Sequence, residues 1–153
     1  MICDNEKFIQ FIEQNRGEFS FIDAAYVATD TDTRHIEQAI QCALPESYIW
    51  FLKKYGAGGI DGADINGVGV PESRYHIIED TAKLIKNSNK LKEGKFLLLE
   101  EYEEGWVFLL NLTHCQQGDD DAPVVAHNTF TDVVDPVWNS FCAFIQERFG
   151  FAK

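Results

Sequence analysis

Residues 44–59 constrain the fold more than any other stretch, because they contain a helix start, an apolar stripe and a helix stop. Pro45 suits the first helical position, since its φ angle is fixed and it has no amide hydrogen to leave unpaired. Gly56 can adopt the left-handed conformation that ends a helix. Between them, four apolar residues recur at helical spacing: Tyr48, Phe51, Leu52 and Tyr55. The spacing predicts a single helix with one buried, aromatic-rich face.

The same segment resembles the Leu-Pro-x-x-Tyr-x-x-Phe-Leu-x-x-Tyr-Gly-Gly hallmark of the SUKH superfamily of SMI/KNR-type domains, which includes bacterial toxin-immunity proteins and fungal cell-wall regulators. The resemblance is strong over residues 33–59. It continues to the C-terminus as a strand-rich middle followed by an aromatic helix. It implies an α+β fold, and the hallmark itself is specific to the fold and carries no chemistry.

The remaining chain predicts helices first, then a sheet, then a closing helix. Helical spacing of apolar residues predicts helices over residues 4–16, 33–43 and 77–87, with a cap at the end of the turn at residues 29–33. The glycine-punctuated residues 56–70 predict one short strand. Asp135 and Pro136 predict the cap and first turn of the last helix.

Three apolar runs predict the strands of the sheet, at residues 96–99, 106–110 and 123–126. Residues 100–105 lie between the first two runs and predict an acidic hairpin turn. The sheet is therefore expected to be antiparallel, with helices packed mainly on one side of it. This is an α+β architecture in one SUKH-like domain over residues 1–153.

Composition predicts a globular core that needs no disulfide or metal to hold the fold, and no cofactor is expected. The chain has 153 residues, 45% of them hydrophobic, and its 12 Phe residues supply large buried surfaces. The four cysteines show no metal-ligand spacing, so we expect reduced thiols and no zinc. The first residues do not resemble a signal peptide, and no run of about 18 apolar residues could span a membrane. These features predict a cytoplasmic protein.

The charge of the chain limits its partners. It has 25 Asp and Glu against 13 Lys and Arg, a net charge of -12. Such a charge would repel nucleic acids and anionic membranes. We therefore expect a protein partner with a basic surface.

Acidic residues gather in one part of the sequence. Residues 96–147 contain ten carboxylates and no Lys or Arg. One interpretation is that two acidic turns share one half of the domain and attract a basic partner, with Tyr102 and Trp106 as anchors. The other is that these turns are merely solvated and Trp106 belongs to the core. The first interpretation nominates these partner-binding residues: Glu100, Glu101, Tyr102, Glu103, Glu104, Trp106, Asp119, Asp120 and Asp121.

Catalytic patterns are weak throughout, and no catalytic residue is predicted. A pair of carboxylates could serve as in glycosidases, but adjacent acids on a turn diverge and stay hydrated. Asp119 to Asp121 lack the alternation of a calcium loop. His114 and Cys115 adjoin without a nucleophile signature, and Gly67-Val68-Gly69 lacks the spacing of a phosphate loop.

For bacterial members, the resemblance implies an immunity protein that binds and neutralises a cognate polymorphic or contact-dependent toxin, often a nuclease. The alternative is a regulatory scaffold like the fungal cell-wall regulators, although this chain shows no long flanking segments. A small hydrolase is a third interpretation, which predicts a deep cleft with acids of raised pKa. The immunity interpretation predicts exposed acids around a shallow groove.

Overall fold

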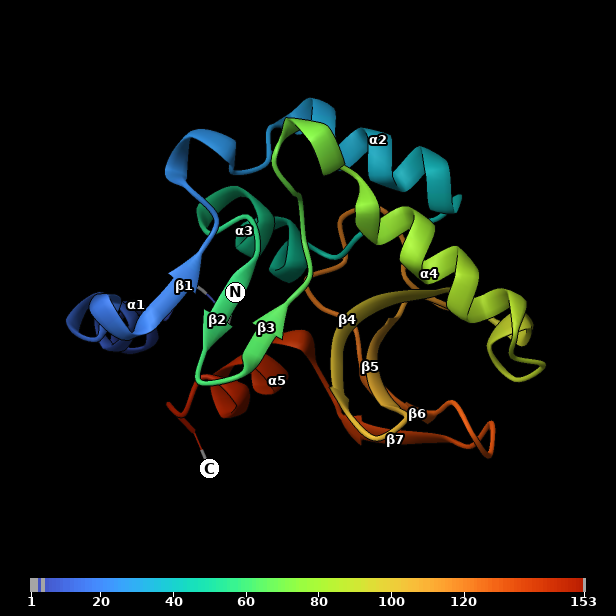
Figure 1. Ribbon diagram of the computed structural model, residues 1–153. Helices are drawn as coiled ribbons and strands as arrows, with labels where there is room; N and C mark the ends of the chain where they lie inside the picture. The colour runs from blue at the N-terminus through green and yellow to red at the C-terminus, as the bar shows by residue number, and fades with distance from the viewer. Residues whose placement is uncertain (1–2, 4, 153) are drawn as a thin grey trace.

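The structure is a computed structural model that describes residue 3 and residues 5–152 (Figure 1). The described residues form helices and two antiparallel sheets, which confirms the predicted α+β class. The helices are α1 (Glu6–Gln14), α2 (Asp30–Ile40), α3 (Glu46–Lys54), α4 (His76–Lys86) and α5 (Phe141–Arg148). The smaller sheet contains β1 (Phe19–Phe21), β2 (Gly58–Ile60) and β3 (Ala63–Ile65). The larger contains, in spatial order, β4 (Phe96–Glu103), β5 (Trp106–Asn111), β6 (Val124–Asn128) and β7 (Val134–Trp138).

The predicted hallmark helix is α3, and its aromatic face is buried as expected. Tyr48, Phe51 and Tyr55 are all within the main core, and the Tyr48 hydroxyl donates a hydrogen bond to the Asn66 carbonyl at 2.8 Å. Burial raises the pKa of Tyr55 to about 12. Gly56 has a φ of 77°, the left-handed conformation predicted for the helix stop.

The larger sheet separates two apolar layers. On one face, β4–β6 pack with α3 and α5 in the main core, through residues such as Leu97, Leu110 and Phe144. On the other face, a smaller cluster around Leu98 and Leu109 packs against α4 and the turn of 3-10 helix at Leu91–Glu93. Figure 1 shows α4 crossing this second face, with α2 beside it.

The prediction for the start of the last helix was wrong. Residues 134–138 form strand β7, which pairs with β6 at the edge of the larger sheet, and Pro136 lies opposite Val125. Proline has no amide to donate, so an edge strand can accept it. The helix begins five residues later, where the Ser140 hydroxyl accepts a hydrogen bond from the Ala143 amide at 3.0 Å.

Three other local predictions need correction. Thr29, not a residue at the end of the turn, caps α2, and its own amide donates a hydrogen bond to the Asp32 carboxylate, which completes a capping box. Pro45 is the cap residue of α3 rather than its first helical residue. The glycine-rich stretch forms two strands, β2 and β3, and β2 also pairs with β1, a three-residue strand that no sequence pattern predicted. Asp4, at the predicted start of the first helix, lies outside the described residues.

The expectation of four reduced cysteines was also wrong. Cys3 and Cys142 form a disulfide between the N-terminal segment and α5, with 139 residues of sequence separation. Cys42 and Cys115 are free and half-buried. No spacing rule applies to a pair at opposite ends of a chain, so the sequence held no signal for this bond.

Among the described residues, no helix is both long and apolar enough to cross a membrane.

Candidate protein-binding surface

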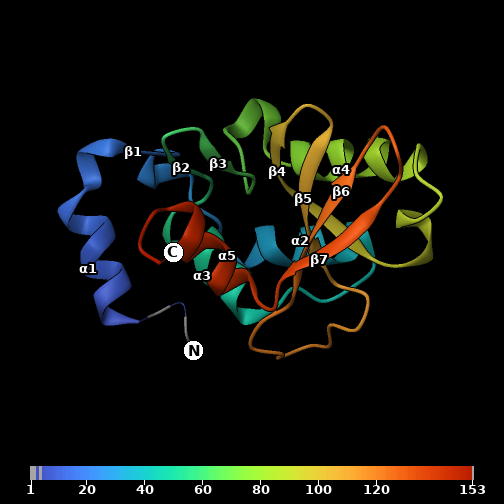
Figure 2. The same cartoon turned by 90° about the horizontal axis from the view of Figure 1, so that it is seen from below.

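The two hairpin turns of the larger sheet lie side by side at one end of it (Figure 2). The Thr129 amide, at the β6–β7 turn, donates a 2.7 Å hydrogen bond to the Gly105 carbonyl, at the β4–β5 turn. The Phe130 ring lies against Gly105, where any larger residue would collide with it. We call the exposed residues of this end the tip surface: Glu101, Tyr102, Glu103, Glu104 and Phe130.

The tip surface combines three exposed carboxylates with two exposed aromatic rings. Phe130 is 79% exposed and Tyr102 is 46% exposed, unusually high values for aromatic side chains. A shallow pocket of about 300 Å³ lies between Tyr102 and the three glutamates, with the half-buried Trp106 in its wall, and the Phe130 ring lies against Gly105 at its edge. Aromatic anchors are enriched in protein-binding sites, and the rims of such sites are polar. The geometry therefore fits the predicted groove with exposed acids around it.

Glu100 does not share this exposure, contrary to expectation. It is 1% exposed, and the Arg148 guanidinium on α5 donates to both of its carboxylate oxygens, at 2.9 and 2.7 Å. The same guanidinium lies 4.9 Å from the centre of the Tyr102 ring. A β-bulge between Leu98 and Glu100 changes which residues face α5, and this turns Glu100 inward. Glu100 therefore lies on the α5 side of the sheet, where it supports the tip surface without being part of it.

The second acidic segment lies at the opposite end of the sheet, so the two acidic segments do not share one half of the molecule (Figure 2). The main-chain carbonyls of Asp119 and Asp120 accept hydrogen bonds from the first two amides of α3, at 2.8 and 2.9 Å. The Asp121 carboxylate accepts from the Ser47 hydroxyl at 2.7 Å and from the Phe141 amide at 2.8 Å. These contacts satisfy helix N-termini, so this segment joins α3 to α5.

Two buried residues, Ser88 and His127, form a cluster with the partly exposed Asp132 that the sequence did not suggest. The Ser88 hydroxyl donates to the Asp132 carboxylate at 2.5 Å, and His127 Nε2 lies 2.8 Å from the same oxygen. A nucleophilic serine would instead pass its proton to histidine. Ser88 and His127 are 1% and 2% exposed, which leaves a substrate no access to them. The cluster fixes the β6–β7 turn that carries Phe130.

Two other groups of reactive side chains, at Cys115 and around Asp121, are also unsuited to catalysis or to metal binding. Burial, with a smaller effect from Asp119, raises the pKa of Cys115 to about 11, so its thiol stays protonated at neutral pH. Among the described residues, Cys3, Asp121 and Cys142 are the one group close enough together to ligate a metal. The two sulfurs form a disulfide, however, and a disulfide offers no thiolate to a metal.

We expect acid to destabilise the fold through two carboxylates. Hydrogen bonds from Ser88 and His127 lower the pKa of Asp132 to about 2. Burial raises the pKa of Asp32, but hydrogen bonds from Arg74, Thr29 and Tyr75 outweigh this effect, and the pKa lies well below its usual range.

Because both folded-state pKa values are lowered, the stabilisation is complete above the unfolded value of about 4 and is lost as the pH falls toward 2. Urea midpoints measured from pH 6 to pH 2 should therefore fall most steeply below pH 4. Asp132→Asn should reduce that slope, whereas the exposed Asp135→Asn should leave it unchanged. Equal slopes for the wild type and Asp132→Asn would contradict this assignment.

Comparison with known protein families gives a match over most of the chain. A family model described as SMI1-KNR4 cell-wall (SUKH_5) matches residues 6–150. The match covers nearly the whole chain, from α1 through α5, and includes every residue of the tip surface.

Proposed function

This chain belongs to the SMI1-KNR4 (SUKH) family, and from that premise we propose that it is an immunity protein which neutralises a cognate toxin by covering the toxin's basic active surface. The toxin would be a polymorphic or contact-dependent toxin of nuclease type. The observation that carries the proposal is the tip surface, where exposed acids and exposed aromatic rings lie together.

Charge explains why a nuclease suits this surface. A nuclease must present Lys and Arg side chains to the phosphates of its substrate. Glu101, Glu103 and Glu104 offer carboxylates that can occupy those cations, in a chain whose net charge of -12 also attracts a basic partner at a distance. The substrate is then excluded by occupation alone, and the immunity protein makes or breaks no bond.

The aromatic rings supply the affinity that charge alone cannot. Exposed ion pairs contribute less than about 1 kcal/mol each. A lethal enzyme must be almost fully bound, which requires a dissociation constant on the order of nanomolar or below, about -12 kcal/mol. Phe130 and Tyr102 can bury large apolar areas in pockets of the partner, as binding hot spots do.

The direct test is co-expression with a toxin domain. The toxin should be the basic C-terminal domain of a secreted protein encoded in the neighbouring reading frame. Cells that express this domain alone should stop growing, and cells that also express the immunity protein should grow. Failure to rescue growth, when the two proteins are both soluble and expressed, would refute the proposal for that toxin.

Variants of the tip surface should separate the two contributions. The triple variant Glu101→Lys, Glu103→Lys, Glu104→Lys should slow association at low salt by about 10- to 100-fold, because steering by charge is lost. Phe130→Ser should instead accelerate dissociation by about tenfold or more with little change in the association rate. Surface plasmon resonance at two salt concentrations measures these rates.

The matched control reverses three exposed acids elsewhere: Glu18→Lys, Asp64→Lys and Glu72→Lys. This control changes the net charge by the same amount, so it should slow association only slightly. Equal slowing by both triple variants would show that net charge acts without a defined site. Unchanged rates in the tip variants would remove the tip surface from the interface.

A further inference from the structure

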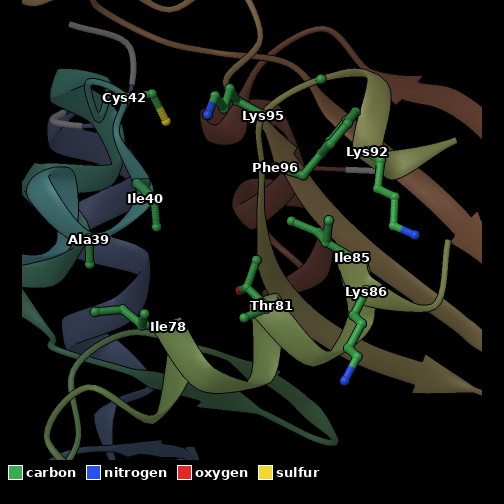
Figure 3. Close-up of a pocket in the computed structure, with 12 residues that line it drawn as sticks. Ala39, Ile40, Cys42, Ile78, Thr81, Ile85, Lys86, Lys92, Lys95 and Phe96 are labelled. Carbon is green, nitrogen blue, oxygen red and sulfur yellow. The ribbon is translucent and has the colours of Figure 1, made fainter. Parts of the chain in front are cut away.

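A second feature, separate from the tip surface, is a pocket between α2, α4 and the start of β4 (Figure 3). Its volume is about 420 Å³, within the range of about 300–1,000 Å³ that is typical of ligand sites. Apolar side chains from three elements face each other across it, namely Ile40 of α2, Ile78 and Ile85 of α4, and Phe96 of β4.

The pocket exists because the chain turns away from α4 at the end of α2. Gln41 adopts a left-handed conformation with a φ of 57°, which ends the helix and leaves Ile40 half-buried beside α4. On the other side, Gly94 leaves room for the Phe96 ring, since a Cβ atom there would lie 2.9 Å from it. The apolar walls are therefore built by backbone conformation and are already formed without a ligand.

The charge around the pocket is opposite to that of the whole molecule. None of the twelve lining residues is acidic, although 25 acidic residues occur in the chain, and three are lysines: Lys86, Lys92 and Lys95. Figure 3 shows Lys95 on the Cys42 side of the pocket and the other two lysines on the opposite side. Among the described residues, no carboxylate lies within ion-pair distance of these three lysines.

We propose that this lysine-rimmed pocket binds a small amphiphilic anion, a carboxylate with an aliphatic chain of medium length. The chain would replace water against Ile40, Ile78 and Phe96, and the carboxylate would pair with a lysine at the rim. At about 30 Å³ for each water-sized group, the volume corresponds to about 14 such groups, which is enough for a chain of about ten carbons with its carboxylate.

The net negative charge of the protein does not prevent this binding. Charges more than about 8 Å apart are largely screened at physiological ionic strength. The acids of the tip surface lie on other elements, and no acidic residue lines the pocket, so the lysines are the charged groups of its lining that the ligand's carboxylate can contact. An uncharged molecule of the same length would fill the apolar part but gain nothing at the rim.

The test titrates the full-length protein with decanoate, below its micellar concentration, and with decanol as the uncharged match. Amide chemical shifts in two-dimensional NMR spectra report the site. We expect decanoate to shift the amides of Thr81, Gly94 and Phe96, and to bind about tenfold more tightly than decanol. Shifts that map outside the pocket, or equal affinities for the two compounds, would overturn the proposal.

Two sets of variants divide the site into its charged and apolar parts. Lys86→Gln, Lys92→Gln and Lys95→Gln together should reduce decanoate affinity to that of decanol. The control set Lys7→Gln, Lys83→Gln and Lys90→Gln removes the same charge outside the pocket and should leave the affinity unchanged. Ala82→Trp places a bulky ring from the exposed face of α4 into the opening and should abolish binding of both compounds. Retained decanoate preference in the first set would refute the role of the lysines.

Discussion

Replacing Arg148 with alanine is expected to lower the free energy of unfolding by about 3–5 kcal/mol, because it leaves a buried carboxylate without its partner. Glu100 is 1% exposed, and both of its oxygens accept hydrogen bonds from the Arg148 guanidinium. In Arg148→Ala, the carboxylate must either stay charged in an apolar site or take up a proton, and each outcome destabilises the fold. Urea unfolding followed by tryptophan fluorescence measures the loss.

A double variant distinguishes a lost partner from lost packing. Glu100→Leu with Arg148→Met removes both charges and keeps apolar volume, so it should recover most of the stability lost in Arg148→Ala. Lys53→Ala is the control for a solvent-exposed ion pair, since Lys53 pairs with the exposed Asp30, and it should cost less than about 1 kcal/mol. If Arg148→Ala cost no more than this control, the buried pair would not contribute to stability as described.

Arg148 also connects stability to the proposed function. Its guanidinium lies over the Tyr102 ring, so the buried pair helps to hold one aromatic residue of the tip surface in place. The five residues Glu100–Glu104 therefore have two different roles, one in the exposed surface and one in the support of the strand. Glu101, Glu103 and Glu104 face solvent, while Glu100 fixes the strand that carries them.

The parts of the fold that could be predicted from sequence are those that local signals determine. In α3, the proline, the aromatic spacing and Gly56 all act within one segment, and the structure agrees with the spacing and with Gly56 and moves Pro45 by only one position, to the cap. Asp135 and Pro136 form an equally good local signal for the start of a helix, but these residues belong to strand β7. Pairing of β7 with β6 outweighs local preference there, and only tertiary structure reveals it.

The candidate site also contains some features that local sequence determines and others that depend on distant residues. The exposure of Glu101, Tyr102 and the other acids could be predicted because polar composition is local, although β4 extends to Glu103 and only residues 104–105 form the turn, but the burial of Glu100 depends on a bulge and on Arg148, 48 residues away. Asp121 likewise contacts Ser47, 74 residues away. Phe130 was missed although a signal was present, since it is a single apolar residue within the polar sequence Asn128-Thr129-Phe130-Thr131-Asp132. A lone aromatic residue in a polar turn has no core to enter.

Loss of the Cys3–Cys142 disulfide is expected to have an effect of similar size, about 3–5 kcal/mol of unfolding free energy. The bond closes a loop of nearly the whole chain, with 139 residues of separation, so it restricts the unfolded state strongly. Urea unfolding with and without a reductant measures the difference. The oxidised protein should also show the smaller dependence on urea concentration, because a cross-linked chain exposes less surface on unfolding.

Variants separate this bond from general effects of the reductant. Cys142→Ala should unfold at the lower urea concentration with or without reductant, while Cys42→Ser and Cys115→Ser should respond to reductant as the wild type does, since both of these cysteines are free. Alkylation of the denatured, unreduced protein should label two of the four cysteines. If all four cysteines were labelled, or if reductant left the urea midpoint unchanged, the disulfide would not contribute to stability. The N-terminal segment would then be held against α5 by packing alone. The large core around α3 and α5 would then have to hold Cys3 without a covalent bond.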